Sequence, residues 1–172
     1  MHAASEDTLL LDALLADEAL YDRLIAAFPA YRSFAKVLMR EDVAGRLTLA
    51  DVARMAGLAP ADVAGVAAGQ PAPAGDSARP AAPPLAEGRP TWADRPESAV
   101  RAFDARPLLE AGHEPLPDIL SFAEAAPASA VLVLDATFHP QPLRRLFEGR
   151  GYESAAEALA ADHWRVYFRR AG

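Results

Sequence analysis

The sequence predicts an α+β protein with an all-helical N-terminal domain, a proline-rich linker and a two-layer β-α-β-α-β-β domain at the C-terminus. Three observations support this prediction. Residues 8–68 have helical spacing without strand signals, seven of the fifteen prolines lie in residues 70–97, and residues 99–172 alternate between strand-like and helix-like segments. The predicted boundaries are 1–68 for the helical domain, 69–95 for the linker and 96–172 for the α/β domain.

The first domain begins with leucines and a phenylalanine near helical spacing, namely Leu10, Leu14, Leu20, Leu24 and Phe28. Asp17 is placed to cap a second helix, and Pro29 ends that run. Thr48 and Asp51 have the spacing of a capping box, and Gly57 suits the position just after that helix. A last helix is expected from Pro60 to about residue 68.

Residues 70–90 are rich in proline, alanine and glycine and poor in large apolar side chains. Such a segment cannot bury enough surface to offset its loss of entropy, so a partly polyproline linker is expected. Trp92 stands at the end of this linker, and we expect it to dock on the domain that follows.

The last part of the chain reads as strand, helix, strand, helix and strand over residues 99–105, 114–126, 129–136, 140–151 and 163–170. The segment 152–159 must be a further strand if one sheet is to form, although its alanines and glutamates favour helix. The two helices are expected on one face of the sheet.

The motifs DARPLLEAGHEPLPDIL, LVLDATFHPQPLRRLFEGRGY and DHWRVYFRR, with the lead-in PTWAD, resemble a bacterial family called domain of unknown function 2249. That family is similar in fold to the TusA sulfur carriers, which place Cys-Pro-x-Pro at the start of their first helix. This sequence has Glu114-Pro115-Leu116-Pro117 at that place, so the resemblance implies a TusA-like fold without the sulfur-carrying thiol.

The first domain resembles a second family, domain of unknown function 1858, through LLLDALLADEALYDRLIAAF and LTLADVARMAGLAPADVAGVAAG. Members of that family often carry a cysteine pair, which this chain lacks. The second stretch is also similar to a repressor helix-turn-helix. Its recognition helix would carry Asp62 as the sole charged side chain, in a segment 1–68 with six basic and ten acidic residues. These features argue against nucleic-acid binding.

Composition excludes several other classes of protein. With no cysteine, the chain forms no disulfide, thiolate nucleophile or iron–sulfur centre. Its net charge of −7 also argues against a general nucleic-acid binder. No apolar run approaches the roughly 20 residues of a membrane helix, and the acidic N-terminus is unlike a signal peptide. A cytoplasmic protein that does not enter membranes is expected.

The predicted topology gathers polar residues at one edge of the sheet. Right-handed crossovers make the first three strands parallel, so both helices begin at the carboxyl edge of those strands. The turn before the last strand lies at the same edge. The residues expected there are Arg106, His113, Glu114, Asp135, His139, Gln141 and His163. Open α/β sheets commonly bind ligands at this edge.

Several chemistries fit this set of side chains. His113, His139 and His163 are candidate ligands for a transition metal ion, and one imidazole could instead bind a haem. Alternatively, Arg106 and the two helix N-termini would hold an anion or small ligand, with Glu114, Asp135 and Gln141 nearby. A purely structural alternative is that the histidines cap helices and satisfy carbonyl groups in turns.

These observations favour a non-enzymatic binding or adaptor module with its site at this edge. One alternative is a small enzyme that uses His139 or His163 as a general base. Another is a protein–protein interaction module that works through the N-terminal helices. The sequence leaves open the ligand, the partner protein and the oligomeric state.

Overall fold

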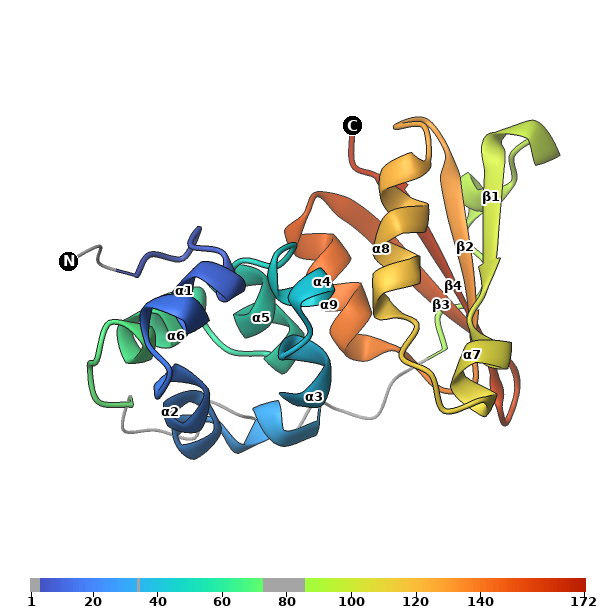
Figure 1. Ribbon diagram of the computed structural model, residues 1–172. Helices are drawn as coiled ribbons and strands as arrows, with labels where there is room; N and C mark the ends of the chain where they lie inside the picture. The colour runs from blue at the N-terminus through green and yellow to red at the C-terminus, as the bar shows by residue number, and fades with distance from the viewer. Residues whose placement is uncertain (1–3, 34, 73–85) are drawn as a thin grey trace. The chain divides into compact units, whose positions relative to one another are not determined.

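The computed structural model describes residues 4–33, 35–72 and 86–172 (Figure 1). The chain divides into two compact units, residues 1–81 and residues 82–172. The first unit is helical and the second combines a sheet with helices, which confirms the predicted α+β class. Residues 73–85, about half of the predicted linker 69–95, lie outside the described residues.

The N-terminal unit contains short helical segments: α1 (Leu10–Ala16), α2 (Leu20–Ala27), the 3₁₀ turn η1 (Pro29–Ser33), α3 (Ala35–Leu38), α4 (Glu41–Ala44), α5 (Leu49–Ala56) and α6 (Pro60–Ala67). The predicted capping box is present, because Thr48 and Asp51 each accept the backbone N–H of the other. Gly57 ends α5 at φ 73°, a left-handed conformation that favours glycine. Helix α4 was not predicted.

The C-terminal unit contains η2 (Thr91–Ala93), η3 (Glu97–Ala99), β1 (Val100–Asp104), α7 (Arg106–Glu110), α8 (Leu116–Ala125), β2 (Val131–Ala136), α9 (Gln141–Gly149), β3 (Tyr152–Ala160) and β4 (His163–Arg170). The short helix α7 was not predicted. The segment from residue 152 is a strand, as the β-α-β-α-β-β order requires. Its intrinsic preference for helix is overridden by pairing with β4 along nearly its whole length.

The four strands lie in the order β1-β2-β4-β3 (Figure 1). Strand β1 is parallel to β2, and β4 runs antiparallel to both β2 and β3. The carboxyl ends of β1, β2 and β3 therefore share one edge of the sheet with the start of β4, as predicted. This edge brings Asp104, Asp135 and His163 onto neighbouring strands.

Helices α8 and α9 cover one face of the sheet, which we call the helix face. Phe122 of α8 contacts Phe103 of β1, and Phe147 of α9 contacts Phe168 of β4. Residues alternate between the two faces along each strand. The opposite face, which we call the open face, therefore carries Asp104, Asp135, His163, Arg165 and Tyr167.

Residues 86–99 pack against the C-terminal sheet. The N–H groups of Glu87 and Gly88 donate to the Ala156 carbonyl oxygen on the outer edge of β3. Trp92 packs against a small cluster on the open face, formed by Ala93, Val131 and Tyr167, which confirms that this tryptophan docks on the following domain. The C-terminal end of the predicted linker 69–95 thus contacts the sheet through Glu87, Gly88, Trp92 and Ala93.

Candidate functional site

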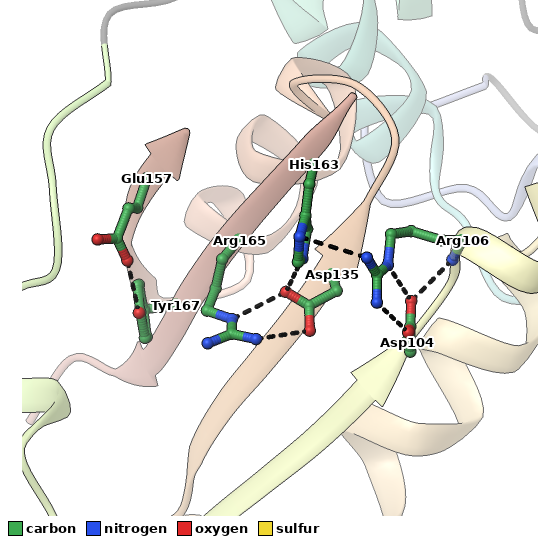
Figure 2. Close-up of polar contacts among 7 residues, drawn as sticks. All are labelled: Asp104, Arg106, Asp135, Glu157, His163, Arg165 and Tyr167. Atoms are coloured by element: carbon green, nitrogen blue, oxygen red, sulfur yellow. Dashed lines mark hydrogen bonds and ion pairs between the residues drawn. The ribbon is translucent and has the colours of Figure 1, made fainter. Parts of the chain in front are cut away.

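Two arginine–aspartate pairs lie side by side at the carboxyl edge of the open face (Figure 2). Arg106 donates through Nε and Nη2 to the two oxygens of Asp104, at 2.9 and 2.7 Å. Arg165 donates in the same way to Asp135, at 2.8 and 3.0 Å. Asp104 and Asp135 are directly opposite each other on β1 and β2. Each adjacent carboxylate is thus neutralised by its own bidentate arginine.

His163 connects the two pairs. Its Nδ1 lies 3.3 Å from Arg106 Nη1, and its Nε2 lies 3.1 Å from Asp135 Oδ1. Because a guanidinium only donates, Nδ1 is the acceptor and the ring proton is on Nε2, which donates to Asp135. The imidazole is therefore held in one orientation between a cation and an anion. We call Asp104, Arg106, Asp135, His163 and Arg165 the edge network.

The electrostatics of the edge network follow from these contacts. Burial raises the pKa of Asp135, but the hydrogen bonds from Arg165 and His163 outweigh burial and hold it below the ordinary value. The hydrogen bonds from Arg106 lower the pKa of Asp104, and the same ion pairs raise the pKa of both arginines. Both pairs are therefore ionised at neutral pH.

A further polar pair borders the edge network on the open face. The Tyr167 hydroxyl donates to Glu157 Oε2 at 2.9 Å, and Glu157 is opposite Arg165 in the β3–β4 register. Burial and this hydrogen bond to Glu157 raise the pKa of Tyr167. The network and this pair together carry three carboxylates and two guanidinium groups, so Glu157 contributes an unbalanced negative charge.

The structure places His139 in a different cluster from His163. Its ring packs edge-on against Trp164, with 4.8 Å between the centroids, and its Nε2 lies 3.3 Å from Arg144 Nη1. Its Nδ1 is buried without a hydrogen-bond partner among the described residues. Burial and the Arg144 charge lower the pKa of His139, so this imidazole is neutral at neutral pH.

The reason for the separation is the alternation of side chains along β4. His163 points to the open face, whereas the next residue, Trp164, points to the helix face, where it meets His139 at the start of α9. The strand topology places both histidines at one edge, but the sheet itself lies between their side chains.

The other predicted residues lie outside the edge network. Glu114 Oε1 accepts the Leu116 N–H at the first turn of α8, so this glutamate caps the start of a helix. His113 is exposed, and its N–H donates to the Leu108 carbonyl oxygen. Gln141 begins α9, and its N–H donates to the His139 carbonyl oxygen.

Of the predicted site residues, the structure joins Arg106, Asp135 and His163 in one hydrogen-bonded network. Across residues 4–33, 35–72 and 86–172 it forms no group of three or more histidine, aspartate or glutamate side chains placed to hold a metal ion. The candidate metal ligands His113, His139 and His163 therefore do not form such a group.

Sequence reasoning missed Asp104 and Arg165 as members of the site. The sequence does contain a signal for each of them. Asp104 lies two positions before the predicted Arg106, and Arg165 lies two positions after the predicted His163. Two positions along a strand return to the same face, so Arg165 follows His163 on the open face. Asp104 ends β1 there, and its side chain accepts the Arg106 N–H across the strand end.

The C-terminal domain is similar to a known family. The family model described as "Uncharacterized conserved protein (DUF2249)" matches residues 102–170, which span nearly all of β1 through β4. The match supports the resemblance predicted for this half of the chain. No curated protein and no solved structure matches the chain. Within the described part of the chain, no helix has the length and apolar character needed to cross a membrane.

Proposed function

We propose that the C-terminal domain is a non-enzymatic binding module whose edge network recognises an anion, either a carboxylate or a phosphate group. One observation carries this proposal. The Arg106 and Arg165 side chains are each 33% exposed, and their ion pairs with Asp104 and Asp135 hold them in place. Arginines held in place by such pairs lose little further entropy when a ligand binds.

The unused hydrogen-bonding capacity of the edge network favours an anion over a cation. Both oxygens of Asp135 accept hydrogen bonds, and its side chain is only 13% exposed. Arg165 binds Asp135 through Nε and Nη2, so Nη1 lies outside that pair, near the Tyr167 side chain, and Arg106 Nη1 uses one of its two hydrogens on His163. The groups still able to bond are therefore donors, which pair with carboxylate and phosphate oxygens.

The state of the histidines supports binding over catalysis. Both ring nitrogens of His163 are engaged, with Arg106 on one side and Asp135 on the other. A general base needs a free nitrogen within reach of its substrate. For His163 to act as a base, Arg106 would first have to move away. For His139, the unpartnered nitrogen is buried.

An anion titration tests this function. In the ¹⁵N-labelled full chain, the Nε–H signals of Arg106 and Arg165 should shift and saturate on addition of sodium phosphate. Sodium chloride of matched ionic strength should not shift them. Arg165→Ala and Arg106→Ala should each weaken phosphate binding roughly tenfold, the loss expected for a hydrogen bond to a charged group.

Two variants sharpen the titration. Arg101→Ala removes an exposed arginine of β1 that makes no hydrogen bond to the described residues, so binding should not change. Glu157→Gln removes the unbalanced negative charge beside Arg165, so phosphate binding should become tighter. Shifts that are the same in chloride and phosphate, or that persist unchanged in Arg165→Ala, would rule out the site.

The proposal extends to the fold of this module, to the N-terminal helices and to the location of the protein. The β-α-β-α-β-β order is compatible with a TusA-like fold, in which Glu114 replaces the thiol and sulfur transfer is lost. For the N-terminal helices we propose membership of the family called domain of unknown function 1858 and an adaptor role. The adaptor role is supported by Leu15, an apolar residue that is 76% exposed. A cytoplasmic location is compatible with the absence of cysteine and is tested by cell fractionation.

A further inference from the structure

The two edge strands of the C-terminal sheet, β1 and β3, differ in whether another segment of the chain forms hydrogen bonds along their outer edges. The outer edge of β3 is covered, because the N–H groups of Glu87 and Gly88 donate to the Ala156 carbonyl and the Glu87 carboxylate accepts the Ala156 N–H. The outer edge of β1 has no backbone partner in the described ranges, apart from the Val100 N–H, which donates to Glu97 within the preceding turn. Unpaired edges of this kind are templates for another strand.

The groups that β1 presents outward follow from its pairing with β2. The Ala105 N–H donates to the Asp135 carbonyl, so the backbone groups of residues 101, 103 and 105 point toward β2. The intervening residues then point away from the sheet. The outward groups still available are the Val100 carbonyl, the N–H and carbonyl of Ala102, and the N–H and carbonyl of Asp104.

We propose that β1 is a self-association edge, which pairs antiparallel with β1 of a second copy about a two-fold axis at Ala102. In that register the N–H of each Ala102 donates to the carbonyl of the other Ala102. The N–H of each Asp104 donates to the carbonyl of the other Val100. All of these outward groups except the Asp104 carbonyl find a partner, because the donor that faces that carbonyl, the Val100 N–H of the other copy, already donates to Glu97.

The side chains of β1 are compatible with this pairing. Residues 101 and 102 are both exposed, and alanine at the axis lets the two strands approach closely. Arg101 of one copy lies opposite Phe103 of the other on the helix face, where a guanidinium can stack on an aromatic ring. Two four-stranded sheets would join as one eight-stranded sheet, and a closed two-fold pair leaves no β1 edge exposed.

Sedimentation equilibrium of the full chain across the micromolar to millimolar range tests the inference, in chloride buffer without added phosphate. The wild-type chain should approach twice the monomer mass as its concentration rises. Ala102→Pro should remain a monomer, because proline removes the central donor. Proline is tolerated where the N–H faces outward on an edge strand, so the pairing of β1 with β2 should survive.

Two further variants separate loss of pairing from loss of folding. Ala102→Lys keeps the N–H but places like charges face to face across the axis, and should weaken the dimer at least tenfold. Ala128→Lys adds the same charge at an exposed turn and should leave the dimer unchanged. Hydrogen exchange gives a second readout, because the Ala102 and Asp104 amides should be protected only at concentrations that form the dimer. A wild-type chain that stays monomeric at millimolar concentration, with both amides exchanging freely, overturns the proposal.

Discussion

At the scale of single residues, Asp135 organises the edge network. It is largely buried, and its two oxygens accept three hydrogen bonds, two from Arg165 and one from His163. Its charge also favours the guanidinium form of Arg106. A neutral residue at this position would weaken both contacts at once and would leave the positions of the two cations less defined.

Replacing Asp135 by Asn is therefore expected to lower the free energy of unfolding by about 1–3 kcal/mol. The folded pKa of Asp135 is lowered, so its contribution to stability is complete above the unfolded value near 3.8 and is lost as the pH falls through the folded value. Urea unfolding of wild type and Asp135→Asn between pH 7 and pH 2 measures this. The difference between the two proteins should shrink below about pH 3.8. A constant difference over the whole range would contradict the role of the carboxylate charge.

At the scale of elements, the covered edge of β3 depends on one ion pair. Arg144 of α9 is 10% exposed, and its Nη2 lies 2.9 Å from Glu87 Oε2. The same guanidinium donates to the Ser154 hydroxyl on β3. The pair thus connects the lead-in segment, a helix and the edge strand, at a position where the N–H of Ala156 also donates to Glu87.

Glu87→Gln should release this contact and lower the free energy of unfolding by about 1 kcal/mol. Hydrogen exchange at the Ala156 amide should accelerate, because the amide oxygen of glutamine is a weaker acceptor for this N–H than the carboxylate and forms no ion pair with Arg144. Glu97→Gln is the matched control, since Glu97 is exposed and its side chain makes no hydrogen bond or ion pair to the described part of the chain. Equal exchange at Ala156 in the wild type and in Glu87→Gln would show that the ion pair does not hold the edge.

At the scale of the whole molecule, the lead-in segment is part of the C-terminal domain. Trp92 and Ala93 cover apolar side chains on the open face, and Arg169 lies over the Trp92 ring at 4.9 Å. Without these residues, Val131 and Val133 would face water on the half of the open face away from the edge network. We therefore expect the domain boundary to lie before Glu87 rather than at residue 96.

Two fragments test this boundary. A fragment of residues 86–172 should unfold cooperatively, at the temperature of the C-terminal transition in the full chain. A fragment of residues 96–172 should melt several degrees lower, because a change of about 1 kcal/mol shifts the midpoint of a domain of this size by roughly 4–8 °C. Calorimetry of both fragments decides the matter, and identical midpoints would place the boundary after Trp92.

Much of the fold could be predicted from the sequence because its signals are local. The capping box of Thr48 and Asp51, the alternation of β4 and the continuous apolar run of β2 each act within a few residues. Strand β3 was harder, since its alanines and glutamates favour helix. The requirement for a sheet partner indicated a strand there, and pairing with β4 provides that partner.

The sequence by itself determined the edge at which the polar residues meet, because strand direction and crossover handedness follow from the order of elements. Only the tertiary structure decided which of them touch. His163 and His139 share that edge, but alternation along β4 places His163 on the open face, whereas His139 contacts Trp164 on the helix face. Side-chain contacts depend on the face as well as the edge, and the face is fixed only when strands pair in register.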